Sequence, residues 1–308
     1  MLAARAGELV VIAAPTGYGK TTTAALWDDA DERPFAWTRM DPLDDDPVHL
    51  LLHIATALER LGAVDPGLLG YLRGSGRGPL THLVPGMVQA LEACGPVVIV
   101  LDEIHELCAP EAVDTLRALI DAAPPSTTVV LIGRRPPSLD LARRRLQKRL
   151  VEIGTDELRL SDAEAAAALS AVSGSRDDGT VSTVLGICEG WAAGVILAGM
   201  ALRDGAAVEA VTGHHDSVAD YLVEEVLDRL DDDTVTFLVE SSVLDRFNAE
   251  QLDEVLERDD SAQMLAGLST TGNLFLVSLD QQRVWYRYHR LFADVLRGRL
   301  RSAASGRL

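Results

Sequence analysis

Cysteine is scarce in this sequence, and long hydrophobic runs are missing. The three cysteines are an odd number and show no C-x-x-C spacing. This argues against a disulfide framework or a zinc site and favours reduced thiols in a cytoplasmic protein. The first apolar run, residues 9–14, follows Glu8 and ends at Pro15 and a glycine turn. It is too short to span a bilayer, so we interpret it as a buried strand rather than a signal peptide, and expect no membrane partner.

Basic residues are also in short supply. Lysine and arginine total 28 against 47 aspartates and glutamates, so the formal net charge is −19. A surface this acidic repels phosphate backbones, which argues against nucleic-acid binding by the chain as a whole. A basic run leaves two alternatives open, the solvated face of a helix or a local nucleic-acid contact; its members are Arg143, Arg144, Arg145, Lys148 and Arg149.

The first half of the chain alternates strand signals with helix signals. The 308 residues, 47% of them hydrophobic, are enough for about two globular domains. We expect strands at residues 9–14, 35–40, 97–101 and 129–132, and helices at 20–27, 48–61 and 110–122. Apolar strands that alternate with helices predict an α/β fold, a three-layer parallel sheet covered on both faces.

The second half is mainly helical. Ser161 and Glu164 form a capping box before an alanine-rich helix, and a second helix is expected to run through residues 180–203. After a linker at 213–216, helical signals cover 218–230 and 234–244, and Asn248 caps a third helix. Two β-rich runs, 274–279 and 284–288, should pair as a hairpin. Three helices before a hairpin indicate a winged helix, so we expect domains at 1–156, 157–216 (a helical lid) and 217–308.

A phosphate-binding loop follows the first expected strand. It consists of Ala14, Pro15, Thr16, Gly17, Tyr18, Gly19, Lys20 and Thr21, with Thr22 next and alanine in place of the usual first glycine. Glycines let backbone N–H groups approach a phosphate, Lys20 supplies a positive charge, and the Thr21 hydroxyl is a ligand for Mg²⁺. Because strand, loop and helix occur in the required order, we expect a P-loop NTPase that binds ATP with Mg²⁺.

Acidic residues end the third expected strand. Asp102 is predicted to join Thr21 in holding Mg²⁺, and Glu103 to polarise the attacking water. Arg134 follows the fourth strand, where a guanidinium can reach a γ-phosphate; the alternative is a surface arginine in a turn. We therefore predict Glu103, Asp102 and Arg134 as the catalytic residues of a slow ATPase.

Segments spread over nearly the whole chain resemble one known family. The chain looks like the regulatory ATPase module of the maltose-regulon activator group, large LuxR-type transcription activators within the STAND class of NTPases. The matching segments are Ala13 to Thr22, Trp37 to Asp41 with Asp45-Asp46-Pro47, Leu101 to His105, Gly133-Arg134 with Pro137, Glu152, Leu158-Arg159-Leu160, Glu189 to Gly194, Asn273-Leu274-Phe275 and Trp285 to Phe292.

The resemblance implies a switch that is closed with ADP and opens and self-associates with ATP. It also implies that a winged-helix histidine, here His289, touches the β-phosphate of ADP; the alternative is a histidine that only packs the wing. Ala192 stands where many STAND proteins carry a proline that packs on the nucleotide. Sensor repeats and a DNA-binding helix-turn-helix follow this module in full-length relatives, so we expect inducer and DNA to be contacted by domains outside this chain, which is a fragment or a stand-alone module.

Two other functions stay open from the sequence. A kinase-like phosphotransferase needs an acceptor site; residues 74–79 are a candidate region, but they show no recognisable acceptor motif. A stand-alone ATPase that binds DNA through its winged helix needs a basic recognition helix, but residues 251–256 read Gln-Leu-Asp-Glu-Val-Leu. We therefore favour the regulatory switch and expect no meaningful DNA affinity at physiological salt.

Overall fold

The computed structural model describes residues 6–62, 64–74, 80–135, 139–174, 177–208, 216–271, 275–280 and 282–305. The chain forms two compact units. The first contains Met1–Ala14 and Lys20–Glu157, and the second contains Pro15–Gly19 and Leu158–Leu308. None of the described helices is long and apolar enough to cross a membrane.

The first unit is built on a five-stranded parallel sheet with the order β2-β3-β4-β1-β5. Its strands are β1 (Leu9–Ala13), β2 (Phe35–Arg39), β3 (Val97–Asp102), β4 (Thr127–Gly133) and β5 (Leu150–Ile153). The register pairs Leu9 with Val129 and Leu101 with Leu131. The expected α/β sheet is confirmed, although β5, at one edge, was not predicted.

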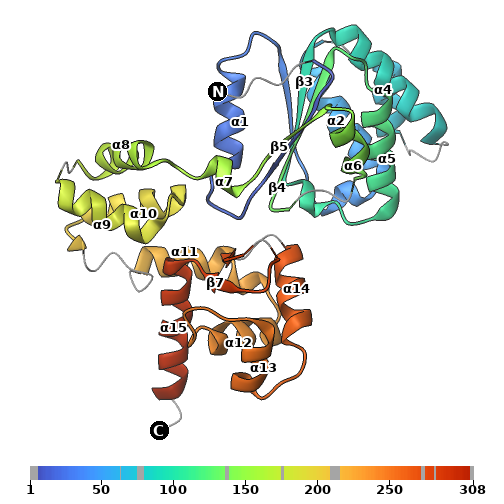
Figure 1. The fold of residues 1–308 in the computed structure, drawn as a ribbon. Coiled ribbons are helices and arrows are strands. Elements are labelled where there is room, and N and C mark those ends of the chain that lie inside the picture. Colours follow the sequence, from blue (N-terminus) through green and yellow to red (C-terminus); the bar gives the residue numbers. More distant parts are fainter. Residues whose placement is uncertain are drawn as a thin grey trace. The chain divides into compact units, whose positions relative to one another are not determined.

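Helices cover both faces of this sheet (Figure 1). The helix α1 (Lys20–Asp28) lies on one face, and α2 (Pro47–Glu59), α4 (Leu80–Cys94) and α5 (Pro110–Ala122) lie on the other. The remaining elements are the short turns η1 (Pro42–Asp45) and η2 (Ile104–Glu106) and the helices α3 (Pro66–Arg73), α6 (Leu141–Leu146) and α7 (Thr155–Leu158). Alternate strand residues such as Val11, Ile99 and Leu131 pack against buried leucines and isoleucines of α2 and α5. This apolar core holds the strand ends that carry the polar site residues.

The second unit begins with helices α8 (Asp162–Ser173), α9 (Asp178–Cys188) and α10 (Ala192–Arg203). The capping box of Ser161 and Glu164 is present at the start of α8. The single helix expected at 180–203 is wrong. Glu189 and Gly190 have φ of 49° and 76°, which ends α9, and a Cβ on Gly190 would lie 2.7 Å from the carbonyl oxygen of Leu160. The chain therefore turns at this glycine before α10 begins.

The rest of the second unit has winged-helix order. It comprises α11 (Asp216–Glu225), η4 (Leu227–Arg229), α12 (Asp232–Ser241), α13 (Ala249–Leu256), α14 (Ser261–Thr271), the antiparallel strands β6 (Leu276–Ser278) and β7 (Tyr286–Tyr288), and α15 (Arg290–Ser305). The predicted hairpin and the Asn248 cap are confirmed. The helix directly before the hairpin is α14, which was not predicted. Residues 251–256, the expected recognition helix, belong instead to the preceding helix, α13. The linker at 213–215, the loop at 75–79 and residues Pro137, Asn273 and Leu274 lie outside the described residues.

Candidate nucleotide site

The phosphate-loop sequence lies between β1 and α1, as predicted. Gly17 and Gly19 have φ of 77° and 76°, a left-handed conformation that favours glycine. Ala14 does not have a positive φ and is buried. A Cβ is therefore tolerated at the one position where this loop departs from the usual glycine pattern.

The two predicted Mg²⁺ ligands contact each other within the first unit. The Thr21 hydroxyl donates to Oδ2 of Asp102 over 2.8 Å. The other carboxylate oxygen of Asp102 accepts the backbone N–H of Glu103 at 2.9 Å. The contact arises because the strands are parallel: β1 and β3 both flank β4, so the end of β3 and the start of α1 meet at the same edge of the sheet.

Lys20 lies among the charged residues at these strand ends. Burial lowers the pKa of its ammonium group, an effect opposed by Glu103 and Asp102 and reinforced by Arg134. These interactions show that all three predicted catalytic residues lie near Lys20. Arg134 directly follows Gly133, the β4 residue that pairs with Ala13 at the end of β1. The arrangement combines two cations with two carboxylates, as a site for a phosphate and a metal ion requires.

Glu103 is held in a strained position. Its φ is 57°, a left-handed conformation that is uncommon outside glycine. Its carboxylate lies 3.9 Å from the guanidinium of Arg39 and 3.2 Å from Nδ1 of His105. That imidazole nitrogen has no aligned hydrogen bond among the described residues. Burial, helped by the charge of Arg134, lowers the pKa of His105 to about 4, so the ring beside Glu103 is neutral at pH 7.

The tip of the phosphate loop packs within the second unit. The indole Nε1 of Trp191 donates to the Thr16 carbonyl over 3.1 Å, and the Ala193 N–H donates to the Gly17 carbonyl over 2.9 Å. A Cβ on Gly17 would lie 2.5 Å from Trp191 Nε1. The loop tip is therefore tied to the first turn of α10 by contacts that need glycine at position 17.

Aromatic side chains extend this connection toward the winged helix. The Tyr18 ring lies 6.3 Å from the Phe275 ring, and Phe275 meets Trp191 edge-on at 4.9 Å. The Thr16 hydroxyl is 3.3 Å from the Tyr221 hydroxyl. Trp191 is fully buried at the centre of these contacts. From the sequence, Trp191 was noted only as part of the family segment Glu189 to Gly194, and no contact with the phosphate loop was predicted for it.

His289 lies between β7 and α15, where the sequence placed it, and only 1% of it is exposed. Its Nε2 is 3.0 Å from the Cys188 carbonyl, so Nε2 carries the hydrogen of the neutral ring. Its Nδ1 is buried and has no hydrogen-bond partner among the described residues. The ring meets Phe275 at 5.5 Å and Trp191 at 6.0 Å, and burial lowers its pKa. His289 thus contacts the same tryptophan that holds the loop tip.

The predicted site residues therefore fall into two sets. Lys20, Thr21, Asp102, Glu103 and Arg134 gather in the first unit, whereas the loop tip, including Tyr18, packs with Trp191 and the ring cluster of His289 in the second. Thr22 lies on the first turn of α1, and its side chain is exposed. The sequence signal that could have revealed the second set is Trp191, a large aromatic residue placed directly after Gly190, the glycine at the end of α9.

Two family models match this chain. The AAA domain matches residues 4–140, and the MalT winged helix domain matches residues 223–308. The chain is 30% identical over 298 residues to the HTH-type transcriptional regulator MalT of Vibrio cholerae, a match that covers 94% of this chain and 33% of the regulator. It is 29% identical over 314 residues to the serine/threonine-protein kinase PknK of Mycobacterium tuberculosis, covering 98% of this chain and 28% of the kinase.

One solved structure shares the fold over nearly the whole chain. The Walker-type ATPase PABY2304 of Pyrococcus abyssi superposes with a TM-score of 0.67 at 14% sequence identity, covering 94% of this chain and 91% of that one. At this identity the likeness concerns the fold, which is that of nucleotide-binding P-loop ATPases. The chain spans about a third of the length of the curated relatives that it matches.

Proposed function

We propose that this chain, a MalT-like module that joins an AAA domain to a MalT-type winged helix domain, is the ATP-dependent switch of a signal-responsive transcriptional activator in the cytoplasm. In this proposal the module is closed with ADP, and it opens and self-associates with ATP. Inducer and target DNA are contacted by other domains of the activator. Hydrolysis is slow and resets the switch.

The residues at the strand ends suit a nucleoside triphosphate with Mg²⁺. Gly19, where a Cβ would have nothing within 4 Å, leaves the loop backbone open to phosphate oxygens, and Lys20 provides the cation. Thr21 and Asp102, already 2.8 Å apart, would hold the metal ion, which would neutralise phosphate charge. Glu103 accepts a proton from the attacking water, and Arg134 contacts the γ-phosphate.

The neutral His105 ring keeps a second positive charge away from Glu103. A cation at 3.2 Å would hold that carboxylate in its ionised form and weaken it as a base. A neutral neighbour does not oppose the transfer of a proton to Glu103.

His289 is proposed as the residue that distinguishes ADP from ATP. Its buried Nδ1 is unpartnered within the described part of the chain. A phosphate oxygen bound there requires a hydrogen on Nδ1, so binding favours the protonated imidazole, which otherwise is disfavoured by burial. The nucleotide and the wing are thereby linked through one ring. A histidine that only packs the wing is the competing explanation.

The observation that carries the proposal is the attachment of the loop tip to α10. Trp191 and Ala193 bind the carbonyls of Thr16 and Gly17, the residues just before the lysine that faces the phosphates. A nucleotide that alters the loop therefore acts directly on the first turn of α10 and on the ring cluster that includes His289. A catalytic enzyme has no need of this connection, but a switch depends on it.

The other functions lack such an observation. The helix before the hairpin, α14, contains no lysine or arginine, and α13 is acidic. Neither suits the major groove, where base contacts come mainly from cationic and amide side chains. No finding favours a phosphotransferase either.

The test is to identify the nucleotide that co-purifies with the protein and then to measure association by sedimentation velocity with ADP and with ATP. Bound ADP, and larger species only after exchange to ATP, support the switch. An empty site with rapid turnover and no change in association would instead support a catalytic enzyme.

A further inference from the structure

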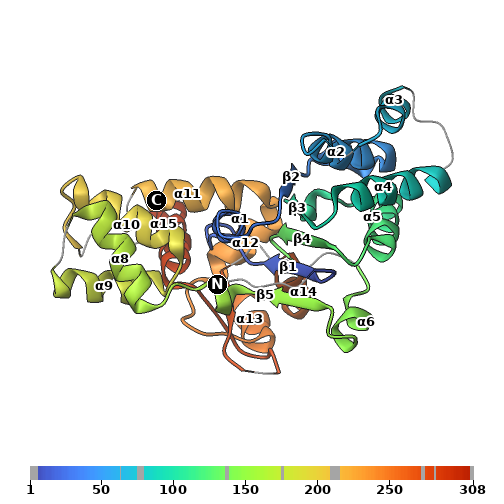
Figure 2. The same cartoon turned by 90° about the horizontal axis from the view of Figure 1, so that it is seen from above.

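Two leucines are strongly exposed at opposite edges of the first unit's sheet. Leu43 is 66% exposed and lies in η1, just after β2. Leu146 is 86% exposed and ends α6, shortly before β5. Because β2 and β5 are the two edge strands, the segments that carry the leucines, after β2 and before β5, belong to opposite edges of the sheet (Figure 2). Each presents a large apolar side chain to solvent, and it is the charge around each leucine that distinguishes the two surfaces.

Carboxylates surround Leu43, and we call residues 41–46 the acidic tip. Within the part of the chain that the structure describes, Asp41, Asp45 and Asp46 accept backbone N–H groups: from Leu43, from Cys108 and Ala109, and from Val48 and His49. These donors are neutral, so the three negative charges remain. The nearest cation in sequence, Arg39, faces Glu103 instead.

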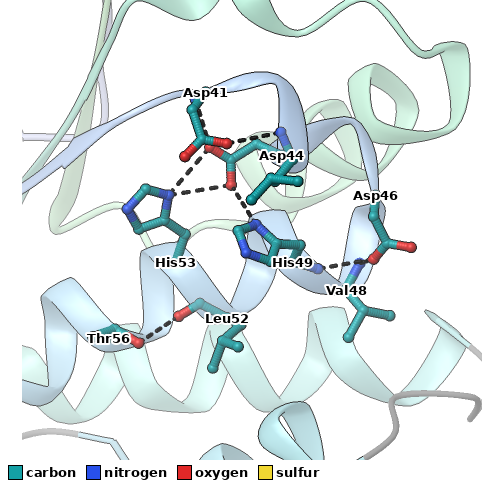
Figure 3. Close-up of polar contacts among 9 residues, drawn as sticks. Asp41, Asp44, Asp46, Val48, His49, Leu52, His53 and Thr56 are labelled. Carbon is teal, nitrogen blue, oxygen red and sulfur yellow. Dashed lines mark hydrogen bonds and ion pairs between the residues drawn. The ribbon is translucent and has the colours of Figure 1, made fainter.

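A buried aspartate makes the acidic tip rigid (Figure 3). Asp44 is inaccessible to solvent and accepts the Asp41 N–H over 2.9 Å. Its two oxygens also lie 3.1 Å from Nδ1 of His49 and of His53, on successive turns of α2. The turn that presents Leu43 is thus held from inside, so little conformational entropy is lost when a partner covers it.

Cations surround Leu146, and we call residues 143–149 the basic tip. Its cations are Arg143, Arg144, Arg145, Lys148 and Arg149. Arg144 pairs with Asp121 and Arg145 with Glu152, and Arg149 donates to the Gly7 carbonyl. Arg143 and Lys148 form no ion pair within the described part of the chain. In a chain of net charge −19, this is a local reversal of sign around an exposed apolar residue.

We propose that the acidic tip of one copy docks on the basic tip of the next, so that copies of this chain associate head to tail through opposite edges of the sheet. The idea rests on the self-association in the proposed function and names its surface. Each tip offers one leucine for burial and a rim of charge that the other tip complements. Like tips repel, so a symmetric dimer through either tip is disfavoured.

A contact between two different surfaces leaves one free tip at each end. Association therefore continues into rings or open chains rather than stopping at a dimer. Rim charges contribute more to orientation and association rate than to affinity, so the contact should weaken as salt is raised.

The experiment uses two charge-reversing variants of the exposed leucines. Leu43→Lys places a cation in the acidic tip, and Leu146→Glu places an anion in the basic tip. Neither side chain is buried, so both variants should fold. Leu26→Lys is the control, because Leu26 lies in α1 and is 64% exposed, nearly as much as Leu43. Association is followed by sedimentation velocity with ATP and with ADP, and ATP binding by calorimetry on the same samples.

We expect each tip variant alone to weaken association at least about tenfold, as loss of a buried leucine and reversal of a rim charge imply. The Leu26→Lys control should associate like the wild type. An equimolar mixture of the two tip variants should recover a heterodimer, because the unaltered basic tip of Leu43→Lys fits the unaltered acidic tip of Leu146→Glu.

Normal association of both tip variants, or a mixture that does not recover, overturns this interface. A wild-type protein that binds ATP but stays monomeric at about 100 µM overturns it too, and leaves nucleotide binding intact. A wild-type protein that associates through these tips without binding ATP would overturn the proposed switch and leave the interface standing.

Discussion

The two units of this protein treat their polar groups in opposite ways. In the first, Lys20, Asp102 and Glu103 gather as charged groups at the ends of parallel strands. In the second, His289 and Tyr288 are enclosed by aromatic rings, and burial lowers the pKa of the histidine and raises that of the tyrosine. Charged groups suit the binding of phosphates, whereas neutral groups suit a packed ring cluster, where a buried charge would be costly.

The phosphate loop is where the two units share a structural element. Lys20 begins α1 in the first unit, but the five residues before it pack with the second. Gly17 and Gly19 have nearly the same φ and yet face different surroundings: Gly17 meets Trp191 and Ala193, and nothing lies within 4 Å of a Cβ on Gly19. This contrast allows the chemistry of the first unit and the response of the second to be tested separately.

The largest effect should come from the cation of the first unit. Lys20→Ala should lower ATP affinity by more than about 100-fold, since charge-assisted hydrogen bonds contribute about 1.5–3 kcal/mol each. Isothermal titration calorimetry measures this. Lys148→Ala is the matched control, because Lys148 is exposed and is the only other lysine in the chain. Unchanged affinity in Lys20→Ala would remove the basis for a phosphate-binding loop.

Changing the two carboxylates should separate binding from hydrolysis. Glu103→Gln should bind ATP normally and hydrolyse it about 100-fold more slowly, the usual contribution of a positioned base. Asp102→Asn should instead weaken binding only when Mg²⁺ is present, because Asp102 contacts the other metal ligand, Thr21. Phosphate release and calorimetry with and without Mg²⁺ report the two properties. A wild-type hydrolysis rate in Glu103→Gln means that Glu103 is not the base.

The two loop glycines should respond differently to alanine. Both substitutions place a Cβ at positive φ, which costs about 1–2 kcal/mol. Gly17→Ala also forces that atom against Trp191 and Ala193, adding about 1–3 kcal/mol as overpacking does. Urea denaturation without nucleotide should therefore show a larger loss of stability for Gly17→Ala than for Gly19→Ala. Equal losses would show that the loop tip is not held by α10 in solution.

His105 should make the protein less stable in acid. Its pKa is about 4 in the folded chain, against an ordinary value of 6.5 for histidine. Below pH 6.5 the unfolded chain therefore gains a proton that the folded chain does not, and stability falls by up to about 3 kcal/mol as the pH approaches 4. His105→Gln should flatten this part of the profile of urea midpoint against pH. An unchanged acid slope would show that the ring is not buried as neutral imidazole.

The smallest effect, and the one that tests the second unit, is expected at His289. His289→Ala should weaken ADP more than ATP, by about five- to tenfold, and increase the associated fraction, since a ligand shifts an equilibrium only by its differential affinity. Tyr288→Phe is the control, because it removes a buried hydrogen bond to Ser241 in the same wing without altering His289. If both variants lower the melting temperature and keep the ADP:ATP preference, His289 is structural.

Local sequence patterns were sufficient to predict those helices, caps and strands that are specified by residues close together in the chain. The helix at 110–122 was predicted to the residue, and the Asn248 cap and the wing hairpin were also found. The phosphate loop and the acids after β3 were recognised because each motif depends on its own backbone. The helices α3, α4 and α14 and the strand β5 were missed, and α9 and α10 were merged, because the stop at Glu189 and Gly190 is made by a turn against Leu160.

The sequence by itself determined the composition of this protein's site: a glycine loop, one lysine, a threonine and two acids, in the order that a P-loop ATPase fold requires. Only the tertiary structure decided which of these residues meet. The contact of Thr21 with Asp102 spans 81 positions, and that of Thr16 with Trp191 spans 175. No local pattern encodes such a distance, because it depends on strand order in a parallel sheet and on the packing of a buried tryptophan against a loop glycine, Gly17.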